Sequence, residues 1–339
     1  MLALLARSRH VFLLLVALQV LASRSAPLRP VKCSTPGASV SIVAGGDVLL
    51  DRGVRTQIQK HGARALFSGI APILHSADFA FANLECPLAR RAPKIARAPA
   101  FKANPNLAPE LKKAGFDVLS QANNHALDCG QAGLGESLDA LAQARLQVLG
   151  AGRTQSQALQ PVVTRARGVR IAWLGASQFA SPLLASQAAR PSVAPLSEGS
   201  LCARVRAARR VADVVVVSVH WGIEYQVAPT PEQRHWAQAA LAAGADIILG
   251  HHSHVLGPIE QVQLNGRRRL VAYSLGNLVF DSPLWNKPTN RSELLSIQVG
   301  REGLRSWKMI PLHITNCCPR PDGVTLKRLR HVQPKRVAQ

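Results

Sequence analysis

The sequence predicts an α/β fold, in which short buried strands alternate with helices. Three observations lead to this prediction. Short apolar runs recur along the chain, helical patterns lie between them, and most of the runs end in polar residues. The 339 residues are enough to fill a core of this kind without a partner chain. One composite domain over about residues 39–315 accounts for the pattern better than two domains do.

The first half of the chain begins with strands and ends with a hairpin. A helix is expected at 131–144 from its leucine spacing, and residues 162–164 and 169–174 are expected to pair around a turn. Residues 180–199 are rich in serine, proline and alanine without a clear period, which predicts a long loop or an insertion. The expected strands share a short apolar run and lie at 40–44, 78–84, 117–122 and 148–150.

The second half continues the alternation. Pro231 opens an expected helix at 231–243, because proline is favoured at an early helical position. Residues 319–339 are basic and carry no apolar period, so we expect a C-terminal tail there. The expected strands lie at 213–219, 246–249, 270–273, 294–299 and 308–314.

The N-terminus has the pattern of an export signal. Arg7 and Arg9 precede an apolar run at 11–21, and small residues follow it. We expect a signal peptide over residues 1–25, either cleaved or retained as a membrane anchor. The sequence therefore predicts an exported protein, in the periplasm or on the cell surface.

An exported chain can form disulfides, and this one contains six cysteines. Cys33 precedes the first strand and Cys317-Cys318 follow the last, so a bridge between them would tie the ends to the domain. Cys86 and Cys129 lie beside two polar motifs and are a second candidate pair. The sequence leaves the pairing open.

The net charge favours an anionic partner. Lysine and arginine total 41 against 19 acids, a formal charge of +22. A proteome rich in arginine explains the same number equally well. Nucleic acid is not expected as a partner, because the export signal, the 4% aromatic content and the lack of any nucleic-acid motif argue against it.

Polar side chains of the types that bind metals follow five of the expected strands. Singly, each has an ordinary structural explanation, since a strand-end aspartate often caps a helix and an asparagine pair often forms a turn. Together they indicate a site for zinc, manganese or iron at the carboxyl ends of the strands. These side chains are Asp47, Glu85, Asn124 with His125, His220, and His252 with His254.

Seven short motifs contain or accompany these residues, at 46–52, 83–85, 123–130, 220–225, 244–246, 250–255 and 274–277. Their order resembles that of the bacterial CapA family, named for capsule and poly-γ-glutamate synthesis, over about residues 40–283. The resemblance implies a fold like the calcineurin-like metallophosphoesterases, a β-sandwich flanked by helices in four αββα layers. A metal centre is then expected at the strand ends.

The resemblance also implies roles for individual residues. His125 matches a general acid, and Asp128 would hold it in the required tautomer. Leu49 replaces the histidine usual two residues after Asp47, and Ser253 replaces a proline. One or two divalent transition metals, manganese, iron or zinc, are therefore expected. The implied ligands are Asp47, Glu85 in the place of a metal-bridging aspartate, Asn124, His220, His252 and His254.

Three further residues are candidates for contact with substrate. Arg52 can pair with an anionic group through two parallel hydrogen bonds, although a solvated surface arginine is an equally good interpretation. Glu224 and Tyr225 are expected at the mouth of the site, with a place in the core as the alternative for Tyr225.

Two functions follow from these features. The first is an exported metal-dependent hydrolase of a phosphoester, or of an amide or ester bond in an anionic polymer. The second is a non-catalytic accessory protein that binds and exports such a polymer, for example poly-γ-glutamate, together with membrane-bound partners of capsule synthesis. Whether the protein is an enzyme stays open at this point.

Overall fold

The computed structural model describes residues 37–180, 189–281 and 288–322. The expected signal peptide at 1–25, Cys33 and the tail from residue 323 onward lie outside these residues. Among the helices of the described ranges, none is long and apolar enough to cross a membrane.

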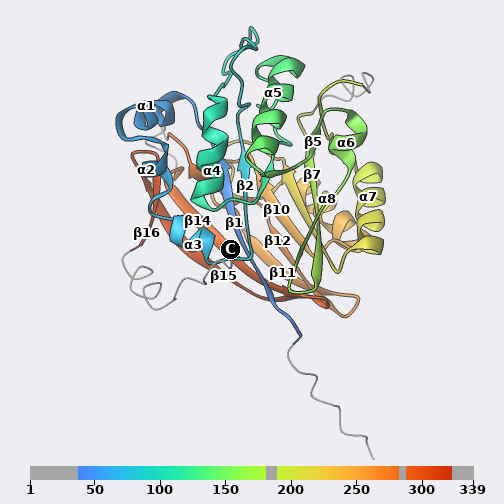
Figure 1. Cartoon of the computed structure of the whole chain (residues 1–339). Helices are drawn as coiled ribbons and strands as arrows, with labels where there is room; N and C mark the ends of the chain where they lie inside the picture. The colour runs from blue at the N-terminus through green and yellow to red at the C-terminus, as the bar shows by residue number, and fades with distance from the viewer. Residues whose placement is uncertain (1–36, 181–188, 282–287, 323–339) are drawn as a thin grey trace, which may run out of the picture. The chain divides into compact units, whose positions relative to one another are not determined.

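Two β-sheets form the centre of the fold (Figure 1). The larger sheet has the strand order β16-β15-β14-β1-β2-β3-β4, with β13 paired to β1. Its strands are β1 (Val40–Val48), β2 (Phe79–Leu84), β3 (Val118–Ser120), β4 (Gln147–Leu149), β13 (Asn277–Val279), β14 (Arg291–Gly300), β15 (Gly303–Thr315) and β16 (Cys318–Pro321).

The smaller sheet has the order β11-β12-β10-β9-β7-β6. Its four central strands β12, β10, β9 and β7 run parallel to one another, and the edge strands β11 and β6 are antiparallel to them. Its strands are β6 (Val162–Ala166), β7 (Val169–Ser177), β9 (Val214–His220), β10 (Ile247–His251), β11 (Ile259–Leu264) and β12 (Arg267–Ala272). A separate short pair joins β5 (Ala151–Gly152) to β8 (Ser192–Val193).

The two sheets pack face to face through an apolar core. Ile42 and Phe81 of the larger sheet meet Trp173, Val216 and Leu249 of the smaller one, and all are buried. The Phe81 and Trp173 rings stack with centroids 5.9 Å apart. A strand covered on both faces reads as a continuous apolar run, which explains the valines of β9 and why the sequence revealed these strands.

Helices cover the outer face of each sheet. The larger sheet is covered by α1 (Arg52–His61), α2 (Ala63–Phe67), α3 (Ala71–His75), α4 (Ala108–Ala114) and α5 (Gly130–Gln143), with a short 3₁₀ turn at Pro105–Leu107. The smaller sheet is covered by α7 (Glu198–Val211) and α8 (Pro231–Ala243), and α6 (Gln155–Leu159) lies beside β5. The four αββα layers expected from the resemblance are therefore confirmed (Figure 1).

Helix α8 shows how local sequence sets an element. Thr230 and Gln233 form a reciprocal capping box, Pro231 occupies the first turn, and Gly244 ends the helix in a left-handed conformation. The observed bounds agree with the range of 231–243 expected from the sequence.

Two expectations about the chain's organisation need correction, and a third is confirmed. The region 180–199 is not all loop, because β8 lies within it and α7 begins at Glu198; residues 181–188 are outside the described ranges. The domain does not end at 315, because β16 pairs with β15 as far as Pro321, inside the expected tail. The predicted hairpin is present as the antiparallel pair of β6 and β7.

The described cysteines carry free thiols. Cys86 is buried in the core between α1 to α5 and the larger sheet, whereas Cys129 packs against Ala89 and Ala92 in a separate small cluster. The expected Cys86–Cys129 pair is therefore wrong for this structure. Cys317 and Cys318 are free as well.

Candidate metal centre

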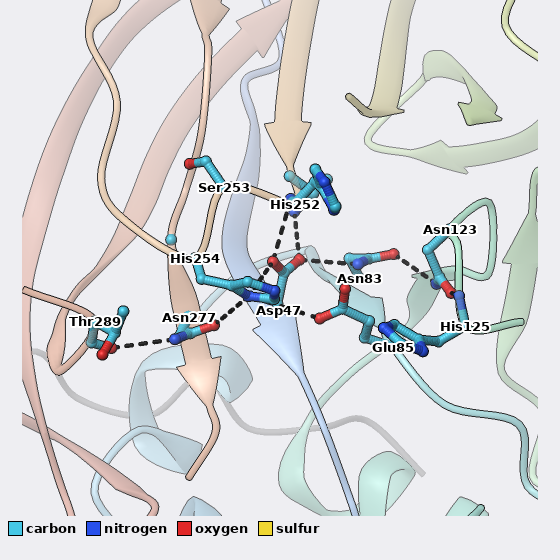
Figure 2. Close-up of polar contacts among 12 residues, drawn as sticks. Asp47, Asn83, Glu85, Asn123, His125, His252, Ser253, His254, Asn277 and Thr289 are labelled. Atoms are coloured by element: carbon cyan, nitrogen blue, oxygen red, sulfur yellow. Dashed lines mark hydrogen bonds and ion pairs between the residues drawn. The ribbon is translucent and has the colours of Figure 1, made fainter. Parts of the chain in front are cut away.

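Strand ends from both sheets converge on one buried site (Figure 2). Asp47 lies near the end of β1, Glu85 directly after β2, and His220 at the end of β9. His252 and His254 follow β10. The structure thus brings together residues that lie as much as 207 positions apart in the sequence, from Asp47 to His254.

The backbone around β1 explains the position of Asp47. The register of β1 against β2 shifts between Ala44 and Asp47, at Gly45-Gly46. A Cβ on Gly46 would lie 1.9 Å from the Gly276 carbonyl oxygen, so only glycine allows this approach. The close contact lets the Asp47 amide donate to the Gly276 carbonyl at 2.9 Å and fixes the carboxylate at the centre of the site.

Glu85, His220 and His252 form the first ligand group. The His220 Nε2 atom lies 3.3 Å from Glu85 Oε1 and 3.2 Å from His252 Nδ1. Each of the three offers one ligand atom, and these atoms lie within 4.8 Å of one another. Asn124 adds an oxygen, since its Oδ1 lies 2.7 Å from His220 Nε2. All four are implied metal ligands.

Asp47, Glu85 and His254 form the second group, with ligand atoms again within 4.8 Å. His254 Nδ1 lies 3.5 Å from Asp47 Oδ2 and 3.9 Å from Glu85 Oε2. Glu85 belongs to both groups, and it therefore occupies the shared position that the resemblance implies for a bridging ligand.

The electrostatics of Glu85 require a cation or a proton. Neither carboxylate oxygen has a hydrogen-bond partner, although the side chain is completely buried. Burial and the charge of Asp47 raise the pKa of Glu85 to about 8. Burial alone would also raise the pKa of Asp47, but its interactions with the surrounding histidines, that with His251 first, outweigh burial and lower it.

His220 and His252 are neutral in this site. Burial, with a contribution from neighbouring histidines, lowers the pKa of His252 to about 2 and that of His220 well below its ordinary value. Neutral imidazole is the form that binds metals. A donor set of imidazoles, carboxylates and an amide oxygen around an unpartnered carboxylate fits a divalent transition metal.

Two histidines of the site have left-handed backbones. His252 has φ 97° and His254 has φ 59°, a region that non-glycine residues avoid. Such residues cost on the order of 1–3 kcal/mol each and persist where the surroundings enforce them. Here the turn brings the His254 ring beside Asp47 (Figure 2), while the His252 ring lies against His220 and the His252 amide donates to Asp47 Oδ2 at 3.3 Å. Between them, Ser253 Oγ donates to the Val255 carbonyl at 3.0 Å and supports the turn.

The structure adds polar residues that were not singled out from the sequence. Asn83 is fully buried, and its Nδ2 donates to Asp47 Oδ1 at 2.8 Å. Asn123 in turn donates to Asn83 Oδ1 at 3.1 Å, and Asn277 Oδ1 lies 2.9 Å from His254 Nδ1. His251 Nδ1 lies 3.3 Å from Asp47 Oδ1 without hydrogen-bond geometry. All four stand in the motifs quoted above, but an amide beside a strand end resembles an ordinary turn residue, and His251 precedes the two histidines that were chosen as ligands.

His125 lies beside the ligand groups and belongs to neither. Its Nδ1 is 2.7 Å from Asp128 Oδ2, and its ring lies against Phe101 with centroids 4.2 Å apart. Asp128 is completely buried and also accepts from Arg97 at 2.7 Å and from the Phe101 amide at 2.7 Å. Arg97 and the Phe101 amide fix the Asp128 carboxylate, which in turn holds the imidazole of His125 in one orientation. The Nε2 atom of His125 is then the one left to react.

A cavity of about 80 Å³ opens at the site. Its lining includes His125 and His254 together with the three substrate candidates, Arg52, Glu224 and Tyr225. Tyr225 is half-buried at the rim, where its amide donates to the Ser253 carbonyl at 2.7 Å, so it is not a core residue.

Arg52 reaches this cavity as part of a network. Its guanidinium pairs with Asp281 at 2.5 Å and lies over the rings of Phe101 and Phe280, 4.9 and 5.2 Å from their centroids. It is therefore neither a freely solvated arginine nor an unpaired one. An anionic ligand would share this guanidinium with Asp281.

Comparison with known proteins identifies the family. Residues 41–282 match the family model described as bacterial capsule synthesis protein PGA_cap. The chain belongs to this family.

Relatives with capsule-related names share most of the chain. It is 34% identical over 279 residues to the PGA biosynthesis protein CapA of Bacillus subtilis strain 168, covering 81% of this chain and 72% of that protein. It is 30% identical over 316 residues to the capsule biosynthesis protein CapA of Bacillus anthracis, covering 91% and 75%. A probable polyglutamine synthesis accessory protein of Mycobacterium tuberculosis strain H37Rv is 30% identical over 256 residues, covering 70% and 66%.

Among solved structures, the sulfate thiohydrolase SoxB of Thermus thermophilus aligns with a TM-score of 0.46 and 16% identity. The alignment covers 81% of this chain and 48% of the SoxB chain, so this protein spans about half of that one.

Leu49 is the main departure of this PGA_cap protein from the ligand pattern. Its side chain is fully buried in the apolar core beneath α1 to α5, and its amide donates to the Val279 carbonyl at 2.8 Å. Position 49 therefore contributes packing. Among the Asp, Glu, His and Cys side chains of the described residues, the second ligand group consists of Asp47, Glu85 and His254.

Proposed function

We propose that this PGA_cap protein is a metal-dependent hydrolase in capsule or poly-γ-glutamate biosynthesis, which cleaves a phosphoester or an amide or ester bond of an anionic polymer. The observation that carries the proposal is Glu85, a fully buried carboxylate without hydrogen bonds that two ligand groups share. The proposed acid His125 and Arg52 line the cavity into which His254 of the second ligand group also opens. Capsule-related names of the relatives support the substrate class.

The chain's own residues supply three parts of such a reaction. Asp47, Glu85, Asn124, His220, His252 and His254 would hold one or two metal ions of manganese, iron or zinc. A bound metal supplies Lewis-acid polarisation and a water of lowered pKa. His125, fixed by Asp128, donates a proton from Nε2 to the leaving oxygen or nitrogen. Arg52 and Tyr225 orient the anionic group of the substrate at the cavity.

Two observations favour a second function. Leu49 lies in the core where a further histidine ligand is usual, which weakens the second metal group. A relative is also named as an accessory protein of polyglutamine synthesis. A non-catalytic protein that binds and exports an anionic polymer, with membrane-bound capsule synthesis partners, accounts for both facts.

We further propose that the protein acts outside the cytoplasm, in the periplasm or at the cell surface. The basic start, apolar run and small residues of the N-terminal 25 positions support this location. Nucleic acid is not part of the proposal, since no recognition motif for it occurs in the sequence.

Metal content and turnover together test the proposal. The full chain, purified without chelators or a histidine tag, is analysed by plasma mass spectrometry and assayed on model phosphoesters and γ-glutamyl amides. We expect one or two transition-metal equivalents and turnover that chelation abolishes. Metal-free protein that is folded and takes up no added metal would contradict the proposal. Metal binding with retention of polyglutamate and no turnover would favour the accessory function.

A further inference from the structure

A second and larger cavity lies beside the metal centre. It has a volume of about 620 Å³, within the range of ligand-binding clefts. Helix α1 and the segment 89–107 form its walls, and Leu50, Ile58 and Leu107 supply apolar surface. None of the residues described above as ligands, acid or substrate contacts lines it.

Four cations line this groove: Arg55, Arg90, Lys94 and Lys102. One carboxylate, Asp51, balances part of the charge, because Arg55 and Lys94 approach it to 2.6 and 2.9 Å. Asp51 is buried and also caps α1, so it is a structural anchor for these two side chains. A second carboxylate, Glu136, accepts from the Arg90 amide at 2.8 Å, so four lining cations face two adjacent carboxylates and the groove keeps an excess of positive charge.

The Arg90 and Lys102 side chains have no carboxylate partner among the described residues. The Arg90 guanidinium donates to Asn106 Oδ1 at 2.9 Å, and the Lys102 ammonium donates to the Arg90 and Ala92 carbonyls at 3.0 and 2.7 Å. The residues outside the described ranges contain no Asp or Glu that could neutralise them. Both charges are therefore available to an anionic ligand.

Neighbouring residues line the groove and the metal-site cavity. Arg52 and Phe101 line the metal-site cavity, whereas the nearby Arg55 and the adjacent Lys102 line the groove. Arg52 and Arg55 stand three residues apart on α1 and so lie on one face of the helix. A linear ligand that lies in the groove would therefore extend along this face of α1 toward Arg52 and the metal centre.

We propose that this groove binds a stretch of a polycarboxylate chain, and so holds a polymer while a neighbouring unit occupies the metal site. The inference rests on the proposed function for the reaction at that site. Cations above an apolar floor match a polymer that carries a carboxylate on each unit and short aliphatic segments between its amides. No aromatic side chain lines the groove for base stacking, which disfavours nucleic acid as the occupant.

Fluorescence anisotropy with labelled poly-γ-glutamate of defined length tests the groove. The full chain is treated with chelator, so that turnover does not contribute. The variant Arg90→Gln/Lys102→Gln removes both unpaired charges. We expect its Kd to be roughly tenfold weaker at low salt, because two partly exposed ion pairs are lost. The wild-type affinity should fall steeply as salt is added.

The matched control removes two charges from the opposite face of the sandwich. Arg206 and Arg210 lie on the exposed side of α7, which covers the smaller sheet (Figure 1). Arg206→Gln/Arg210→Gln should change the Kd less than twofold. If circular dichroism shows that the groove variant is unfolded, Arg90→Gln/Lys94→Gln replaces it. This second variant keeps Lys102 and its hydrogen bonds to the Arg90 and Ala92 carbonyls.

The outcomes separate this inference from the proposed function. Equal weakening in the groove and control variants overturns the groove, even if the protein hydrolyses a small phosphoester. Tighter, groove-dependent binding of polyphosphate or RNA of equal charge also overturns it. Selective loss of polyglutamate binding supports the groove, including in a protein that shows no turnover and so fails as a hydrolase.

Discussion

Replacing Glu85 by glutamine should have opposite effects on the metal-free and the metal-bound protein. Burial and Asp47 raise the pKa of Glu85 from 4.5 to about 8. The unfolded chain thus releases this proton as the pH rises through 4.5, whereas the metal-free fold keeps it until about pH 8. Stability contributed by the protonated form is lost over this window, at about 1.4 kcal/mol per pH unit.

At pH 8 the cost to the metal-free fold is about 4 kcal/mol, and at pH 5 it is below about 1 kcal/mol. Glutamine has no charge to bury, so chelator-treated Glu85→Gln should melt roughly 10 °C higher than wild type at pH 8 and nearly alike at pH 5. Thermal melts followed by circular dichroism at the two pH values provide this measurement.

Glu85→Gln should gain stability without metal but lose metal content. Glu85 is shared by both ligand groups, so Glu85→Gln should bind markedly less metal than wild type under equal exposure. Glu293→Gln is the matched control: Glu293 is also a buried carboxyl with an unpartnered oxygen, and its pKa is raised to about 7 by burial alone. Wild-type metal content in Glu85→Gln, measured by plasma mass spectrometry, would refute the assignment of a shared ligand.

Three more changes give distinct expected results. Glu293→Gln should stabilise the fold by about 3 kcal/mol at pH 8 and little at pH 5, because the cost of burying the ionised carboxyl appears between pH 4.5 and 7; equal melting shifts at both pH values would contradict this. His125→Ala should keep the wild-type metal content and lower kcat by about 10²–10⁴, so metal loss in this variant would show that His125 is a ligand. Leu49→His should lower the free energy of unfolding by about 3 kcal/mol in a urea titration without adding metal, because position 49 lies in an apolar core; a gain of one metal equivalent would contradict the assignment to packing.

The strands were predictable because their surroundings leave a simple pattern in the sequence. β9 and β10 are covered on both faces and read as continuous apolar runs. The helices over the larger sheet leave a weaker pattern. Val54 is the one buried residue of α1, and the buried stripe of α7 is interrupted by arginines. β16 was missed because its four residues, two of them proline, become a strand only by pairing with β15.

The candidate ligands were predictable as a set because parallel strands deliver their ends to the same edge of the fold. The contacts around them depend on tertiary structure. The Arg52–Asp281 pair joins residues 229 positions apart, and nothing in either local sequence indicates it. Likewise, Asn83 and Asn277 were recognisable only as parts of motifs. Their contacts with Asp47 and His254 follow from the packing of β1 against β2 and β13.

Three departures from ordinary protein structure lie together at the metal site. Glu85 is buried without a hydrogen bond, and His252 and His254 take left-handed backbones within the same site. Each feature destabilises the metal-free fold, and such costs persist where a bound group or a function compensates for them. A cation coordinated by Glu85 would satisfy its oxygens. The two strained histidines would then serve as ligands of the same site. The same reasoning predicts that metal binding raises the melting temperature more in wild type than in Glu85→Gln, the variant that has lost the buried charge.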